Sequence, residues 1–311
     1  MRALLLLAFG GPRSLEEVEP FLTRLFRGRK PSSEQVERIK ERYQLIGGSS
    51  PLPGITRDQA MALEKKLNER GFSFKSYVGM RYGHPLIEET IEEILRDGLS
   101  EVIAIPMAPF RSRASTGAYV EEAGRVLRAL GETGLKVSFV EGWHRHPFFI
   151  EAVREKIEEG LMKFEPRSRK GVHLVFTAHS LPASVVEKDL YVKDMKESVQ
   201  RVLEGIGPFP RRIAFQSKGG GAEEWLGPDV ESALTDLSGE KVGEVLIIPI
   251  GFVSDHIEIL YDVDILFQRK AASLGMVLKR TESLNASDKF IEALTAAVED
   301  KIAPHGIKKL Q

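Results

Sequence analysis

Short apolar segments alternate with longer amphipathic segments along the whole chain, and this alternation limits the folds that the sequence can adopt. The apolar segments are rich in Val, Ile, Leu and Phe and lie at 4–9, 74–79, 101–107, 136–141, 173–178, 212–216, 244–250 and 276–279. The amphipathic segments space their apolar residues as helices do and lie at 56–70, 86–97, 119–130, 148–163, 194–206, 229–236 and 288–302. Such alternation, with nearly continuous apolar strands, is typical of parallel sheets that helices cover on both faces.

The expected strands fall into two groups of four, separated by a helix that begins near Pro147. A chain of 311 residues also exceeds the size at which a single core stops growing, about 250–300 residues. We therefore expect an α/β protein with two Rossmann-like, doubly wound halves, each built on a four-stranded parallel sheet. The halves should comprise residues 1–145 and 146–285, with a last helix in 286–311 that packs back on the first half. Ligands of such sheets bind beyond the carboxyl ends of the strands, so the active site is expected in the cleft between the halves.

Composition excludes several classes of protein. The chain has 44 Lys and Arg against 45 Asp and Glu, which argues against broad electrostatic binding to nucleic acid. It has no cysteine, so disulfides, thiolate zinc sites and cysteine-ligated iron–sulfur clusters are excluded. No apolar run approaches the roughly 20 residues of a membrane-spanning helix, and the apolar residues 3–9 read as a buried strand rather than a signal peptide. A cytoplasmic protein is expected.

One histidine lies at a predicted strand end. His179 follows the apolar run 173–178 and precedes Ser180, which places an imidazole at the mouth of a buried strand. Its ring could simply be satisfied by backbone groups there. Because strand ends face the ligand cleft in this architecture, a functional histidine is about equally well supported.

An acidic cluster follows the next-to-last strand. Asp255, Glu258 and Asp262 are spaced three and four residues apart, so on a helix they share one face. A solvated face, with Asp255 as a helix cap, is one interpretation; metal ligands or proton carriers at the cleft are the other. The position after a strand end, like that of His179, favours the functional interpretation. His256 adjoins the cluster but should face another side of the helix.

A basic and aromatic segment at 24–53 suggests an acidic, flat ligand. Its side chains could clamp carboxylates, with the arginine forks giving directional contacts. A charged surface linker is the alternative. The residues concerned are Arg27, Arg29, Lys30, Arg42 and Tyr43.

Taken together, these features resemble the ferrochelatase family. Six segments match in the family's order, and the resemblance runs over nearly the whole chain. They are 5–12 (LLLAFGGP), 42–51 (RYQLIGGSSP), 78–85 (VGMRYGHP), 176–182 (FTAHSLP), 215–218 with 225–228 (FQSK and WLGP), and 249–264 (PIGFVSDHIEILYDVD).

The resemblance implies a lyase of haem biosynthesis that inserts Fe²⁺ into a porphyrin and releases two protons. It implies catalytic and metal-binding roles for His179 and Glu258, with Asp262 continuing the metal or proton path. The side chains expected at the macrocycle or its propionates are Phe9, Arg27, Arg29, Arg42, Tyr43, Ser50, Tyr119 and Trp225. Iron and porphyrin are then substrates, no tightly bound cofactor or iron–sulfur cluster is expected, and partners are a transient haem acceptor or the preceding enzyme.

Three residues depart from the family pattern. Phe9 stands where one branch has a Tyr that approaches the iron, Leu266 replaces an acid at the end of the acidic stripe, and Phe26 replaces an Arg of close relatives. Residues 27–31 (RGRKP) resemble the branch that metallates coproporphyrin III, which has four propionates, whereas 80–85 (MRYGHP) resembles the protoporphyrin IX branch. The resemblance leaves both porphyrins open.

Two other functions fit the same fold. A cobalt or nickel chelatase for a sirohydrochlorin-type ring would usually have paired metal histidines, whereas the second ligand here is Glu258. A non-catalytic haem carrier or sensor would need neither His179 nor Glu258.

Overall fold

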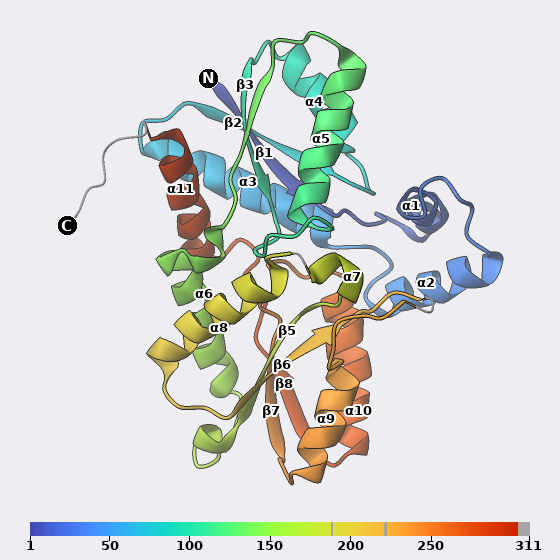
Figure 1. Ribbon diagram of the computed structural model, residues 1–311, viewed down its shortest axis with the longest axis vertical. Helices are drawn as coiled ribbons and strands as arrows, with labels where there is room; N and C mark the ends of the chain where they lie inside the picture. The colour runs from blue at the N-terminus through green and yellow to red at the C-terminus, as the bar shows by residue number, and fades with distance from the viewer. Residues whose placement is uncertain (188, 221–222, 304–311) are drawn as a thin grey trace.

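The protein folds around two four-stranded sheets, both entirely parallel (Figure 1). The computed structural model describes residues 1–187, 189–220 and 223–303. The strand order is β2-β1-β3-β4 in the first sheet and β6-β5-β7-β8 in the second, so the two halves repeat one topology. The strands are β1 (Arg2–Ala8), β2 (Phe74–Met80), β3 (Glu101–Pro106), β4 (Lys136–Phe139), β5 (His173–His179), β6 (Arg211–Gln216), β7 (Glu244–Ile248) and β8 (Val277–Arg280). All eight predicted strands and the two-sheet α/β class are confirmed.

Helices cover both faces of each sheet. The α-helices are α1 (Val18–Leu25), α2 (Ser33–Leu45), α3 (Leu52–Glu69), α4 (Ile87–Arg96), α5 (Thr116–Leu130), α6 (Pro147–Leu161), α7 (Ala183–Val186), α8 (Tyr191–Ile206), α9 (Val230–Gly239), α10 (Gln268–Ser273) and α11 (Asp288–Ile302). The remaining helical segments are η1 (Leu15–Glu17), η2 (Trp143–Arg145), η3 (Arg169–Gly171) and η4 (Glu258–Phe267).

The apolar run of β1 is continuous because this strand lies inside the sheet and is covered on both faces. Leu4 and Leu6 join a core with α3, whereas Leu5 and Leu7 join a second core with α4 and α5. Successive side chains of a strand point to opposite faces, so a strand buried on both faces needs an apolar residue at every position. In the second sheet, Val175 of β5 faces α9 and its neighbours point to the α6 and α8 side.

The segment after β7 differs from the regular α-helix that we predicted. It forms a π-helix, η4, that continues into α10. Asp255 lies before this helix and accepts hydrogen bonds from Ser283 Oγ (2.8 Å) and Asn285 Nδ2 (2.9 Å). The prediction that Asp255 shares a face with Glu258 and Asp262 is therefore wrong, because the helix begins too late to include it.

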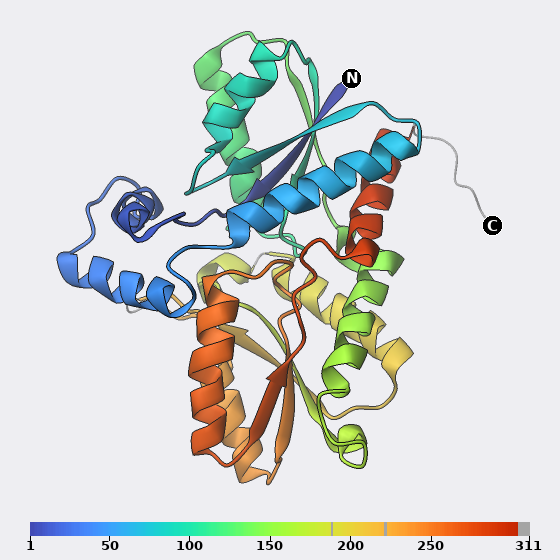
Figure 2. The ribbon, with the colours of Figure 1, turned by 180° about the vertical axis from the view of Figure 1, so that it is seen from behind.

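Helix α11 bridges the two halves (Figure 2). It packs against α3 of the first sheet and against α6 of the second. Arg70 of α3 forms ion pairs with Glu292 and Glu299 of α11. We propose 1–145 and 146–285 as the two halves; of the segment 286–311, residues 304–311 lie outside the described part of the chain. None of the described helices is long and apolar enough to cross a membrane.

Candidate active site

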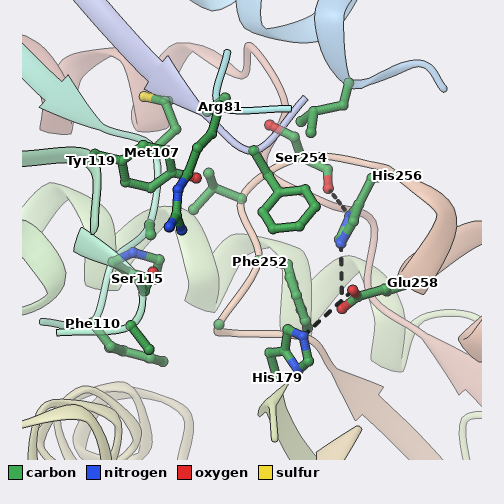
Figure 3. A pocket seen from close by; sticks show the side chains of 18 of the residues that line it. Arg81, Met107, Phe110, Ser115, Tyr119, His179, Phe252, Ser254, His256 and Glu258 are labelled. Atoms are coloured by element: carbon green, nitrogen blue, oxygen red, sulfur yellow. Dashed lines mark hydrogen bonds and ion pairs between the residues drawn. The ribbon is translucent and has the colours of Figure 1, made fainter. Parts of the chain in front are cut away.

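A pocket lies between the two halves at the carboxyl ends of their inner strands (Figure 3). Phe9 follows β1, Met107 follows β3, His179 ends β5, and Phe252 follows β7; all four line the pocket. The chain leaves a parallel sheet at these points, which frees side chains and backbone to face a ligand. The pocket thus occupies the cleft between the halves.

His179 and Glu258 meet at one side of the pocket. His179 Nε2 lies 3.7 Å from Glu258 Oε1. The two residues are 79 positions apart in the sequence, and the fold of the second half brings them together. The His179 carbonyl oxygen accepts a hydrogen bond from the Tyr191 hydroxyl (2.9 Å), which fixes the end of β5. His179 Nδ1 and Glu258 Oε2 are buried and have no hydrogen-bond partner among the described residues. Buried polar atoms are rarely left unsatisfied, so these two are candidates to bind a ligand.

Glu258 is held as a carboxylate. Burial opposes its ionisation, but the charges of His179 and of the neighbouring His256 outweigh that effect and lower the pKa of Glu258 to about 2. A carboxylate beside an imidazole offers two ligand types that a divalent transition metal accepts.

His256 also belongs to the site, contrary to our expectation. Its Nε2 lies 3.8 Å from Glu258 Oε2, and its Nδ1 lies 3.0 Å from the Ser254 carbonyl oxygen. Because a carbonyl only accepts, Nδ1 must carry the proton and donate it. The helical-face argument failed since residues 254–256 are not helical.

Asp262 lies one turn beyond Glu258 on η4 and outside the pocket lining. It accepts a hydrogen bond from Ser217 Oγ (2.6 Å). Burial raises the pKa of Asp262, and the nearby charge of Glu258 raises it further, whereas Ser217 lowers it. The Arg42 guanidinium stacks 5.0 Å from the Tyr261 ring centroid on the same helix.

The structure separates the predicted macrocycle contacts into three groups: those that line the pocket, one that lines an adjoining groove, and those that line neither. Phe9, 40% exposed, and Tyr119, buried, line the pocket. Arg27 lines an adjoining groove instead. The others do not line the pocket: they are Arg29, Arg42, Tyr43, Ser50 and Trp225.

The residues outside the pocket have packing roles or face solvent. Ser50 is buried against Gly11, where an added Cβ would lie 2.5 Å from Ser50 Cβ, and its backbone N–H donates to the Pro12 carbonyl (2.8 Å). Tyr43 is buried in the core formed with α1. Trp225 packs over Gly219, and Arg29 is exposed.

Of the wall that faces His179, sequence reasoning named Tyr119 and missed Arg81, Met107 and Ser115. These residues come from the first half and lie across the pocket from the His179–Glu258 pair (Figure 3). The Pro106–Pro109 strand end was a visible signal for this wall. Arg81 lies in the segment 78–85 that matches the family, but no role was assigned to it there. Two further histidines have structural positions: the His146 side chain caps α6, and His144 is fully buried.

Similarity to solved structures defines the class. SirB from Bacillus subtilis with Fe³⁺ superposes with a TM-score of 0.59 at 12% identity, covering 97% of this chain and 96% of SirB. CbiX, described as the terminal enzyme of sirohaem biosynthesis in denitrifying bacteria, superposes with a TM-score of 0.55 at 11% identity, covering 97% and 100%. The fold is the chelatase fold, with a histidine–carboxylate pair in its cleft.

Similarity in sequence defines the family within that class. The family model described as Ferrochelatase matches residues 1–302. A coproporphyrin III ferrochelatase of Halalkalibacterium halodurans is 38% identical over 96% of this chain and 97% of its own, and a ferrochelatase of Geotalea uraniireducens is 40% identical over 97% and 98%. The chain belongs to the ferrochelatase family. It is a lyase that inserts ferrous iron into a porphyrin in haem biosynthesis, and neither alternative function is favoured.

Proposed function

We propose that this ferrochelatase metallates coproporphyrin III, with His179 and Glu258 as the centre where iron enters and pyrrole protons leave. The observation that carries the catalytic assignment is the pairing of His179 Nε2 with Glu258 Oε1 at 3.7 Å in the pocket between the halves. Two atoms at this separation can both reach one divalent ion at ordinary ligand distances of roughly 2.0–2.2 Å.

The reaction needs a proton acceptor as well as a metal ligand. A free-base porphyrin carries two pyrrole N–H groups, and each gives up its proton as Fe²⁺ forms bonds to the four ring nitrogens. The His179 imidazole accepts one such proton, and Glu258, held as a carboxylate, balances the imidazolium charge. Asp262, whose pKa is raised by burial, extends this path along η4 and can exchange a proton nearer to neutral pH than an ordinary Asp.

Charge around the pocket supports an anionic porphyrin. Arg81 lines both the pocket and the adjoining groove, and Arg27 and Arg128 line the groove. Glu88, Glu121 and Glu122 also line the groove, but none of these three arginines forms an ion pair with a carboxylate in the described part of the chain. Free guanidinium groups favour carboxylate ligands, and coproporphyrin III offers four propionates where protoporphyrin IX offers two.

The relatives support the same substrate. Those of Halalkalibacterium halodurans and Bacillus subtilis, 38% and 36% identical, are named coproporphyrin III ferrochelatase. Phe26 stands where the family resemblance places an Arg that would contact a propionate. Another side chain must then contact that propionate, and we propose Arg81, which lines the pocket.

The test is anaerobic insertion of Fe²⁺ into coproporphyrin III and protoporphyrin IX, followed by absorbance. We expect the native enzyme to favour coproporphyrin III, and His179→Ala to lower kcat about 10²–10⁴-fold through loss of the proton acceptor. Arg81→Ala should reduce the preference for coproporphyrin III. Arg96→Ala, an equal loss of charge at an exposed position of α4, is the control and should leave the preference intact.

Each contrary result has one meaning. Equal or faster turnover of protoporphyrin IX would overturn the substrate assignment and leave the catalytic pair standing. Full activity of His179→Ala would overturn the catalytic assignment instead. A cytoplasmic location, no tightly bound cofactor, and a haem acceptor or preceding enzyme as transient partner stay predictions of the sequence.

A further inference from the structure

One wall of the pocket is a loop with no regular secondary structure. Residues 107–115, here called the wall loop, connect β3 to α5 and contribute Met107, Phe110 and Ser115 to the pocket. Only short-range bonds hold the loop from within, such as Ser115 N–H to the Ser112 carbonyl (3.3 Å). The position of this wall must therefore be set from outside the loop.

Two carboxylates of the second half hold the wall loop. Asp194 of α8 accepts three hydrogen bonds from Arg111: from the backbone N–H (3.0 Å), from Nε (2.9 Å) and from Nη2 (2.8 Å). Asp189 Oδ2 accepts from Ser112 Oγ (2.8 Å) and from the Arg113 backbone N–H (2.9 Å). Both acids belong to residues 189–194, here called the clamp segment.

The Asp194 carboxylate is fully buried and ionised. Burial would raise its pKa, but the hydrogen bonds from Arg111 lower the pKa below its usual range. His144 Nε2 lies 3.5 Å from Asp194 Oδ1, but burial lowers the pKa of His144, so Arg111 is the cation that balances this charge. A bidentate pair with a buried carboxylate strongly restricts the relative position of its two partners.

The clamp segment also holds the opposite side of the pocket. Tyr191 donates from its hydroxyl to the His179 carbonyl (2.9 Å), and its ring meets Phe110 of the wall loop edge to face, with centroids 5.9 Å apart. The same six residues thus contact His179 and the wall that faces it.

We propose that Asp194 is a positioning residue that, through Arg111, fixes the separation between the first-half wall of the pocket and His179. The macrocycle must fit between these two sides with its pyrrole nitrogens toward the His179–Glu258 pair. Release of Arg111 removes one of the two carboxylate anchors of the wall loop, while His179 and Glu258 remain on β5 and η4. Loss of the clamp should therefore affect the porphyrin and not the iron.

Asp194→Asn tests this inference with little change of shape. We expect about 10- to 100-fold loss in kcat/KM for the porphyrin, weaker porphyrin binding by fluorescence titration, and an unchanged KM for Fe²⁺. Arg111→Gln should give the same pattern, and the double variant should lose no more than the worse single variant, because both act through one pair.

The control is Arg70→Ala, which removes another arginine that joins distant elements, here α3 and α11. It should lower the unfolding midpoint and leave porphyrin affinity unchanged. Native porphyrin affinity and kcat/KM in Asp194→Asn, measured well below its unfolding midpoint, would overturn the inference. If Asp194→Asn does not fold, the test falls to Arg111→Gln: native porphyrin affinity in this variant, once it is shown to be folded, would also overturn the inference. The inference rests on the proposed chelatase reaction. The assays use whichever porphyrin turns over faster, so that an error in the coproporphyrin III assignment does not affect the outcome.

Discussion

At the scale of single residues, the pocket contains buried polar atoms that make no hydrogen bond within the described part of the chain. His179 Nδ1 and Glu258 Oε2 are buried without a partner among the described residues, and Glu258 stays ionised only because two histidines stand beside it. Such an arrangement weakens a folded protein unless a ligand completes it. The charge on Glu258 is therefore coupled to folding as well as to catalysis.

Replacing Glu258 with Gln should make stability less sensitive to acid. Its pKa is about 2 in the folded chain against 4.5 for the free side chain, so the carboxylate stabilises the fold above pH 4.5 and this contribution is lost as the pH falls toward 2. In urea unfolding, the difference between the native protein and Glu258→Gln should shrink below pH 4.5. Asp262→Asn should behave in the opposite way, because burial raises that pKa and the ionised form is disfavoured at neutral pH.

The meeting of His179 and Glu258 in the pocket was predictable from sequence, and much of its surroundings was not. His179 and Glu258 both follow strand ends, where the topology alone brings them to one edge of the sheet. His256 was missed because the backbone at 254–256 is not part of the helix that the spacing suggested. Arg81 was missed because the matching segment 78–85 does not show which of its side chains reaches the pocket. The structure also leaves Ser50 and Trp225 in packing positions.

At the scale of elements, the turn between β7 and η4 is fitted against the end of β5. A Cβ at Gly251 would lie 2.5 Å from Ala178 Cβ and 2.8 Å from Ala178 Cα, and the Gly251 N–H donates to the Thr177 carbonyl (3.0 Å). Both contacts are immediately next to His179. The end of β5, which carries His179, and the turn that leads to Glu258 are thus held in direct contact.

Gly251→Ala should disturb both stability and catalysis. We expect a loss of about 1–3 kcal/mol in unfolding free energy from overpacking, with a fall in kcat because β5 must shift at Ala178. The control is Gly239→Ala at the end of α9, where an added Cβ meets nothing within 4 Å. That change should leave kcat alone and keep or raise stability. Native stability in Gly251→Ala would contradict the tight contact.

The sequence predicted the strands well because a strand that is buried on both faces appears in the sequence as a continuous run of apolar residues. It could not predict the π-helix, since Ile259 and Val263 fit the buried side of either kind of helix. What the pattern does encode is that Glu258 and Asp262 follow one another along η4, four residues apart.

At the scale of the whole molecule, the two halves share a core. One cluster of buried apolar side chains includes Leu4 and Ile103 of the first sheet, Phe176 and Leu246 of the second, and Phe290 of α11. A boundary near residue 145 therefore divides the topology without dividing the packing. We therefore expect the two halves to unfold as one cooperative unit, with the two sides of the cleft held together by this core.

Phe290→Ala tests this view of the molecule. The fully buried Phe290 ring lies 5.8 Å from the Trp143 ring and 6.5 Å from the Phe149 ring, at the junction of the halves. We expect a loss of about 3–5 kcal/mol in unfolding free energy, with tryptophan fluorescence and far-ultraviolet circular dichroism still following one transition. Lys289→Ala, which removes only the exposed ion pair with Glu155, should cost about 0–1 kcal/mol. Two separate transitions in the native protein would mean that the halves fold independently, and the cleft would then have to be held by contacts such as the Arg111–Asp194 pair alone.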